Sequence, residues 1–212
     1  MMIPQSETLN QNESEMKLVL ATKNPGKLRE LQSLASYSKE DLNWVNFELA
    51  PNKFNPDETG NTFAANALIK AQEAARLTKS YAIADDSGIA VDALDGRPGV
   101  YSARYAEDEH KACLKLIDEL KDVPPAKRTA AYHCVMILVS PIGAILCQAE
   151  GIWRGRIIDD MRGSEGFGYD PIFYLDDYGK TVAQISLVEK NKLSHRAQAW
   201  RQIEKYLLTQ RP

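Results

Sequence analysis

Residues 81–93 read YAIADDSGIAVDA, a short apolar run that ends abruptly in two adjacent acids and a serine. Asp85 and Asp86 are soon followed by Gly88, which lets a backbone turn tightly. Alternating apolar residues return at 89–93, so we expect the acids to lie at the end of a strand. Acids, serine and glycine are also common turn residues, and taken alone the segment fits a plain turn equally well.

The two acids also indicate a chemistry. Neighbouring carboxylates repel each other unless a proton or a cation lies between them. Their hard oxygen atoms suit Mg²⁺, particularly when a phosphate group supplies the remaining ligands. The segment therefore predicts either a magnesium site that faces a phosphorylated ligand or a turn with no function.

The composition limits the classes of protein to consider. The chain has 212 residues, of which 44% are hydrophobic and 26% charged, as in soluble globular proteins of one large or two small domains. The formal net charge of −3 argues against a general nucleic-acid binder, which would carry a basic face. A local basic pocket for a small phosphorylated ligand is compatible with this charge.

Three features indicate the cellular location. The cysteines at 113, 134 and 147 form no C-x-x-C pair, so we expect buried thiols in a reducing compartment. Residues 1–15 are polar and lack the apolar core of a secretion signal, which predicts a disordered N-terminus. No apolar run is long enough to span a membrane. We therefore expect a cytoplasmic protein that binds neither membranes nor nucleic acids.

Strand and helix patterns alternate in both halves of the chain. Apolar runs predict strands at 17–22, 45–49, 128–139, 144–153 and 166–175, of which the third and fourth form a hairpin. Apolar spacings of three and four residues predict helices that begin near 24–26 and 62–63, a helix over 107–121 and a C-terminal helix after Ser194. This alternation favours an α/β fold, built as one two-lobed unit over residues 16–212.

Residues 22–27, TKNPGK, join the first predicted strand to the first predicted helix. Free backbone N–H groups and the helix dipole at such a junction attract phosphate. Asn24 adds an amide donor and Lys27 adds a full positive charge. The spacing is not that of a P-loop, and a helix merely capped by Asn24 is the alternative.

Charged residues also flank the second predicted helix. Glu58 precedes the helix and is a candidate to join Asp86 around one metal ion. Lys70, further along the helix, is either exposed to solvent or directed at the same anionic site, and a lone lysine is usually exposed.

Two segments near the C-terminus indicate a pocket for a flat ligand. In GFGYDP at 166–171, two glycines bracket Phe167, whose ring is thereby presented for stacking, although Asp170 before a proline also fits a simple turn. Ser194 is a natural helix cap and precedes His195 and Arg196. An arginine at a helix start opposes the dipole, and this cost suggests that it serves a ligand, with a purely structural role as the alternative.

Taken in order, these segments resemble the Ham1/RdgB-type nucleoside triphosphate pyrophosphatases, which include inosine triphosphatase. The resemblance covers roughly residues 17–208. It is carried by TKNPGK at 22–27, ETGNTFAANALIKA at 58–71, ADDSGIAVDALDGRPGVYSARYA at 84–106, GFGYDPIF at 166–173, and EK with SHRAQA within 189–199. It implies an elongated, bent mixed sheet with flanking helices, two lobes around a central cleft, and a homodimer.

The resemblance also implies roles for individual residues. Asp86 would be the general base and Lys70 would neutralise phosphate charge, while Glu58 and Asp86 would bind Mg²⁺. The residues implied in binding substrate are Thr22, Lys23, Asn24, Pro25, Gly26, Lys27, Ser87, Phe167, Gly168, Tyr169, Asp170, Lys190, His195 and Arg196. Within this set Phe167 would stack on the purine, and Arg196 is a candidate donor to its O6 atom.

One position departs from the T-F-x-E-N-A pattern usual in bacterial members, because Ala65 stands where that pattern has glutamate. The missing carboxylate would be a helix cap, worth about 1 kcal/mol, or part of the metal site. We expect Mg²⁺-dependent hydrolysis of ITP, dITP and XTP to the monophosphate and pyrophosphate, through attack of water on the α-phosphorus. A nucleotide-binding regulator without activity and a general nucleotide pyrophosphatase are the alternatives.

Overall fold

The structure is a computed structural model that describes residues 15–211. The predicted disordered N-terminus falls, apart from Glu15, outside these described residues. The strands are β1 (Met16–Leu20), β2 (Val45–Leu49), β3 (Tyr81–Val91), β4 (Thr129–Val139), β5 (Ile145–Ile157), β6 (Phe173–Leu175) and β7 (Lys180–Thr181). The α-helices are α1 (Pro25–Tyr37), α2 (Phe63–Thr78), α3 (Glu109–Glu119), α4 (Leu187–Leu193) and α5 (His195–Leu208), and a short 3₁₀ segment, η2, covers Gly99–Arg104.

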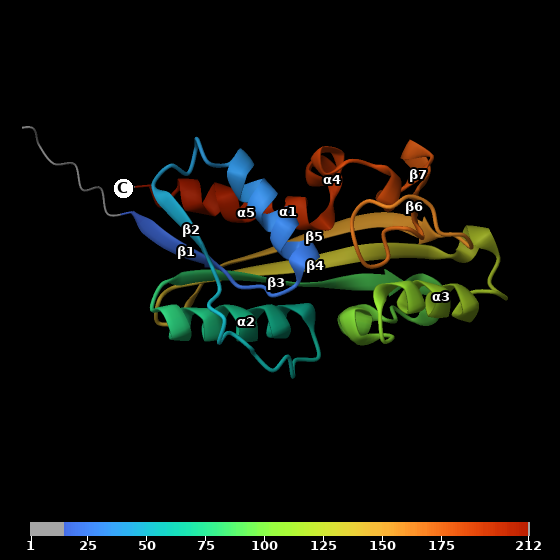
Figure 1. The fold of residues 1–212 in the computed structure, drawn as a ribbon, viewed down its shortest axis with the longest axis horizontal. Helices are drawn as coiled ribbons and strands as arrows, with labels where there is room; N and C mark the ends of the chain where they lie inside the picture. Colours follow the sequence, from blue (N-terminus) through green and yellow to red (C-terminus); the bar gives the residue numbers. More distant parts are fainter. Residues whose placement is uncertain (1–14, 212) are drawn as a thin grey trace, which may run out of the picture.

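All seven strands form one mixed sheet, in the order β2-β1-β3-β4-β5-β6-β7. β1 is parallel to both β2 and β3, whereas β3 to β7 are antiparallel to their neighbours. The long strands β3, β4 and β5 run along the length of the molecule (Figure 1). The predicted α/β class and mixed sheet are confirmed.

Helices cover both faces of the sheet, and the side chains of β3 alternate between them. Ile83 belongs to an apolar cluster with α1 and α5, whereas Ala82 and Ala84 belong to a cluster with α2 on the opposite face. A third cluster at the far end joins Ile89 and Val91 to α3. Figure 1 shows α1 and α5 on one side of the long strands and α2 on the other.

Helix starts follow local sequence signals. The Asn24 side chain accepts from the backbone N–H of Lys27 at 2.9 Å, and the Ser194 side chain accepts from that of Ala197 at 3.2 Å. Both predicted caps are therefore confirmed. No helix within residues 15–211 combines the length and the apolar character needed to cross a membrane.

The prediction that Asp85 and Asp86 lie at a strand end is wrong. β1 pairs with β3 only as far as Ile83, but the antiparallel partner β4 continues the pairing to Val91, so the acids lie inside a long strand. Gly88 makes no turn. A Cβ there would lie 2.3 Å from the carbonyl oxygen of Gly99, so glycine is needed for the close approach of η2 to the sheet.

Other boundaries differ more modestly from the predictions. The predicted hairpin is present, and its second strand runs on to Ile157. Of the predicted strand at 166–175, only Phe173–Leu175 is a strand, and the glycine-rich part before it is a loop. The elements β7 and α4 were not predicted.

Candidate active site

Two adjoining cavities lie where the N-terminus of α1 meets β3. The first has a volume of about 370 Å³ and contains Glu58, Lys70 and Asp86 in its wall. The second has a volume of about 260 Å³ and is lined by residues from the 167–170 loop and from the α4–α5 segment. Both cavities share Asn24, Lys27, Ser87 and Ala103. A ligand with a flat group at one end and a charged tail at the other would span the pair.

The predicted site residues gather around these cavities. The first is lined by Thr22, Lys23, Asn24, Lys27, Glu58, Lys70, Asp86 and Ser87. The second is lined by Asn24, Lys27, Ser87, Phe167, Gly168, Tyr169, Asp170, Lys190, His195 and Arg196. Pro25 and Gly26 line neither, but Gly26 lies against the Phe167 ring, because a Cβ there would be 2.5 Å from it.

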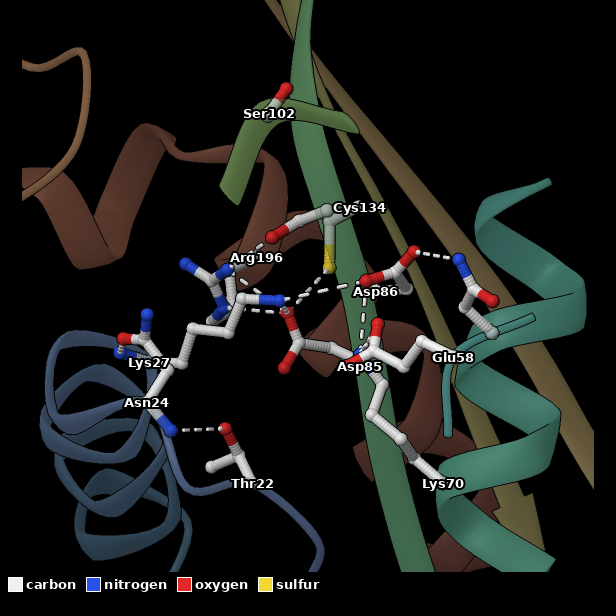
Figure 2. Close-up of polar contacts among 12 residues, drawn as sticks. Thr22, Asn24, Lys27, Glu58, Lys70, Asp85, Asp86, Ser102, Cys134 and Arg196 are labelled. Atoms are coloured by element: carbon white, nitrogen blue, oxygen red, sulfur yellow. Dashed lines mark hydrogen bonds and ion pairs between the residues drawn. The ribbon is translucent and has the colours of Figure 1, made fainter. Parts of the chain in front are cut away.

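Acidic and basic side chains converge in the first cavity. The Nζ atom of Lys70 lies 2.9 Å from Oδ1 of Asp86 and 3.1 Å from Oε2 of Glu58. The Nζ atom of Lys27 lies 3.9 Å from the same Asp86 oxygen. Figure 2 shows these groups reaching toward one another from α1, α2, β3 and the loop before α2. Lys70 is therefore directed at the anionic site and is not a solvent-exposed lysine.

The two carboxylates that meet at Lys70 suit a magnesium ion that a phosphate chain also binds. Mg²⁺ is commonly held by one or two protein carboxylates together with phosphate oxygens and water. Within residues 15–211, no group of three or more His, Cys, Asp or Glu side chains is placed to form a complete metal cage. The donor set of Glu58 and Asp86 fits an ion that completes its coordination with phosphate oxygens and water.

Asp85 and Asp86 differ in environment because consecutive side chains of a strand point to opposite faces. Asp85 is fully buried and pairs with Arg196 Nη2 at 3.0 Å and with Lys27 Nζ at 3.3 Å. Burial opposes ionisation of Asp85, but Lys27 and Arg196 hold its pKa well below the usual range. For Asp86, burial prevails over Lys70 and Lys27 and raises the pKa. Asp85 is thus a fixed counter-charge, and only Asp86 faces the first cavity.

Asn66 is a site residue that the sequence analysis missed. Its side chain is completely buried, and its Nδ2 donates to Oδ2 of Asp86 at 3.2 Å. Its Oδ1 accepts from the backbone N–H of Gly60 at 2.8 Å, so the same amide holds the loop that carries Glu58. Asn66 thereby orients one oxygen of Asp86 and leaves the other toward Lys70.

Ala65 lies at the third position of α2. Its backbone N–H donates to Oγ1 of Thr62 at 3.1 Å, which is half of a capping box. A glutamate at position 65 would be placed to complete the box by accepting from the backbone N–H of Thr62. The geometry favours the helix-cap interpretation of this departure, which leaves the acids of the first cavity in place.

In the second cavity, Asp170 organises the loop that carries Phe167. The carboxylate of Asp170 accepts from the backbone N–H of Phe167 at 2.9 Å, from Tyr132 Oη at 3.1 Å and from Lys190 Nζ at 2.5 Å. The Phe167 ring has Lys190 Nζ 4.9 Å from its centroid. Asp170 is therefore a buried anchor for this loop, and the alternative of a simple turn device is wrong.

Arg196 has buried structural partners, so its place at a helix start does not by itself require a ligand. Arg196 is 1% exposed and donates to Glu30 at 2.5 Å, to Asp85 at 3.0 Å and to Ser87 Oγ at 2.8 Å. Glu30 also pairs with Lys190 at 2.7 Å. These ion pairs give the arginine oppositely charged partners at a helix start, where the dipole alone would disfavour a cation.

Glu30 is another site residue that was not predicted from the sequence, although a signal existed. Lys27, Glu30, Leu31 and Leu34 follow the i, i+3, i+4, i+7 spacing of one helix face. Leu31 and Leu34 are buried core residues, so an acid on their face needs a buried partner. The partners, Lys190 and Arg196, are distant in sequence and could not be identified from the pattern.

His195 lines the second cavity and packs against an aromatic side chain. Its ring stacks on Tyr132, with centroids 4.8 Å apart and planes at 10°. Burial, together with Arg196, lowers the pKa of His195 well below its usual value, so the imidazole is neutral. Its Nδ1 is buried and has no hydrogen-bond partner within residues 15–211.

Comparisons with known proteins identify the family that the chain resembles. Residues 18–206 match the model of the Ham1 family. A dITP/XTP pyrophosphatase of Geobacillus kaustophilus is 48% identical over 187 residues, covering 86% of this chain and 90% of the relative. A dITP/XTP pyrophosphatase of Synechocystis is 44% identical over 186 residues, covering 88% of this chain and 92% of the relative. The solved structure of a HAM1 protein from Coxiella burnetii superposes with a TM-score of 0.79 at 37% identity, covering 92% of this chain and 99% of that one.

Proposed function

The chain belongs to the Ham1 family, and we propose that it is a nucleoside triphosphate pyrophosphatase that converts ITP, dITP and XTP to the monophosphate and pyrophosphate. The observation that carries this proposal is the pair of cavities that meet at Lys27 and Ser87. One offers an aromatic ring and buried polar groups to a base, and the other offers lysines and carboxylates to a phosphate chain. The α-phosphate of a bound nucleotide would lie where the two cavities join.

The reaction requires water to attack the α-phosphorus while pyrophosphate leaves. Asp86 lies at the cavity wall with one oxygen held by Asn66, so its other oxygen is placed to accept the proton of the attacking water. Lys27 and Lys70 offset the charge that develops on the leaving group. Glu58 and Asp86 would hold Mg²⁺, which when bound shields the phosphate charge and polarises the phosphoryl oxygens.

Selection of the base rests on donors and acceptors in the second cavity. Hypoxanthine and xanthine carry an acceptor at position 6, where adenine carries an amino donor. In this cavity Lys190 and Arg196 supply only donors. Adenine's amino group would be left unpaired beside them, and unpaired buried polar groups can supply discrimination of order 10⁴.

Pyrophosphate release from a panel of nucleotides with Mg²⁺ tests the proposal. Wild-type protein is expected to release pyrophosphate from ITP, dITP and XTP far faster than from ATP, and Asp86→Asn is expected to be inactive. GTP and dTTP complete the panel. Binding of ITP without pyrophosphate release would indicate a regulator instead. Equal rates for all nucleotides would indicate a general pyrophosphatase.

Two further parts of the proposal come from the family resemblance. We expect a homodimer, which light scattering of the purified chain would test. We also expect a cytoplasmic location, which fractionation of cells that express the chain would test.

A further inference from the structure

The first turn of α5 rests on three small residues that form a row across the sheet. Ser87 on β3 is paired with Cys134 on β4, which in turn is paired with Gly151 on β5. Directly paired residues project to the same face. Ser87 Oγ accepts from Arg196 Nη2 at 2.8 Å, which places the start of α5 over this row.

Gly151 permits the closest approach in this contact. A Cβ at Gly151 would lie 1.9 Å from the carbonyl oxygen of His195 and 2.9 Å from Cβ of Gln198. The nearest atoms belong to the backbone of α5 and cannot be moved by a change of rotamer. Because a carbon and a carbonyl oxygen in contact lie about 3.3 Å apart, any side chain at Gly151 would force the helix start and the strand apart by roughly 1.4 Å.

Two glutamines hold the same helix to the outer edge of β5. β6 pairs only with Arg156 and Ile157, so among residues 15–211 no strand lies beside the earlier part of this edge. There the backbone N–H of Ile152 donates to Gln198 Oε1 at 3.2 Å, and Gln202 Nε2 donates to the carbonyl oxygen of Glu150 at 2.5 Å. Gln198 and Gln202 are four residues apart, so they lie on one side of α5.

The next row of the sheet receives the His195 ring. Tyr132 is paired with Trp153, and the imidazole stacks on both rings, at 4.8 Å and 6.5 Å between centroids. The row of small residues at Ser87, Cys134 and Gly151 thus fixes the backbone of the first turn of α5. The aromatic pair in the next row fixes the side chain of His195. His195 and Arg196 both line the second cavity, so this contact sets the position of its wall.

We propose that Gly151, together with Gln198 and Gln202, positions the base-recognition end of the site by holding the first turn of α5 on the sheet. None of these three residues lines either cavity. The inference rests on the proposed function only for the identity of the ligand. A displacement of about 1 Å can cost as much as a hundredfold in rate when it misplaces groups that contact substrate.

The test compares Gly151→Ala with wild type by nuclear magnetic resonance and kinetics. The chain has three histidines, so their ring signals are easily distinguished. The ring signal of His195 is expected to move, since it depends on the stacking with Tyr132 and Trp153, whereas that of the exposed His110 on α3 stays. The KM for ITP is expected to rise roughly tenfold to a hundredfold. Binding of inorganic triphosphate, measured by calorimetry, is expected to be unchanged.

Two further variants separate positioning from general destabilisation. Ile203→Val removes a methyl group from the buried face of α5, so it should lower the unfolding midpoint without moving the His195 signal or the KM. The double variant Gln198→Met, Gln202→Met removes the edge hydrogen bonds without a clash, and should change the His195 signal and the KM in the same direction as Gly151→Ala. It serves as the test if Gly151→Ala does not fold.

The proposal is overturned if the His195 signal and the KM stay at wild-type values, or if inorganic triphosphate binding falls as much as ITP binding does. Failure of the proposed function would look different. Wild-type protein would then release no pyrophosphate from ITP, while the His195 signal would still report whether Gly151 sets the position of the helix start.

Discussion

Replacement of Glu30 by glutamine tests the buried ion pairs that join α1 to α4 and α5. Glu30 Oε1 lies 2.7 Å from Lys190 Nζ, and its Oε2 lies 2.5 Å from Arg196 Nη1. The three residues are 3%, 3% and 1% exposed, so water cannot replace a lost partner. Glutamine keeps the shape of the side chain and removes its charge. Two buried cations would then share less negative charge.

The expected loss of stability is large. Removing one partner of a buried ion pair costs about 3–5 kcal/mol, against a total folding stability of about 5–15 kcal/mol for a typical domain. We expect a value near 3 kcal/mol, since the amide oxygen still accepts one hydrogen bond and Asp85 and Asp170 remain as counter-charges. Glu48→Gln is the matched control. Its partner Lys17 is 61% exposed, and surface pairs are worth about 0–1 kcal/mol.

Urea unfolding of both variants over a range of pH gives the assay. Burial opposes ionisation of Glu30, but Arg196 and Lys190 hold its pKa below the ordinary value of 4.5. A lowered carboxyl pKa stabilises the fold above the unfolded pKa, and this stabilisation is lost as pH falls through the folded pKa. The difference in the free energy of unfolding between wild type and Glu30→Gln should therefore be largest at neutral pH and should shrink below pH 4.5. A loss no larger than that of Glu48→Gln, or one independent of pH, would refute the reasoning.

Three other changes give distinct outcomes. Asp86→Asn is expected to abolish pyrophosphate release from ITP with little change in the circular dichroism spectrum, and chelation of Mg²⁺ should do the same; near wild-type turnover would remove Asp86 as the base. Phe167→Ala should weaken binding of every purine nucleotide by about 1–3 kcal/mol, measured by calorimetry, because stacking ignores base identity; unchanged affinity would make the ring a packing element. Arg196→Lys keeps the buried positive charge that an alanine would remove. It should lower the ratio of kcat/KM for ITP to kcat/KM for ATP about tenfold, which corresponds to about 1.4 kcal/mol. Equal losses of kcat/KM for both nucleotides would instead place Arg196 on the phosphates.

The parts of the fold that were predictable depend on local signals. Asn24 and Ser194 cap their helices, and apolar alternation marks the two strands of the hairpin, because each preference acts within a few residues. The continuation of β3 past Asp86 depends on pairing with β4, about fifty residues away in sequence. The residues of this stretch, Asp85 to Gly88, are ones that favour turns. Pairing with the distant strand β4 overrides that local preference.

The sequence could predict which residues lie at the candidate site, but much less of which residues contact one another there. Every segment that carried the family resemblance lies at the cavities, but the sequence could not show that Asp85 and Asp86 face different partners. Glu30 and Asn66 were missed because their importance comes from contacts with residues far along the chain. A buried charge or amide is recognised by its partners, and sequence patterns do not reveal partners at long range.

The proposed function requires water to attack the α-phosphorus of the bound nucleotide at this site. Hydrolysis of ITP in ¹⁸O-labelled water, followed by mass spectrometry of the products, measures this directly. We expect one labelled oxygen in the inosine monophosphate and none in the pyrophosphate. Label in pyrophosphate, or release of inorganic phosphate with inosine diphosphate, would contradict it.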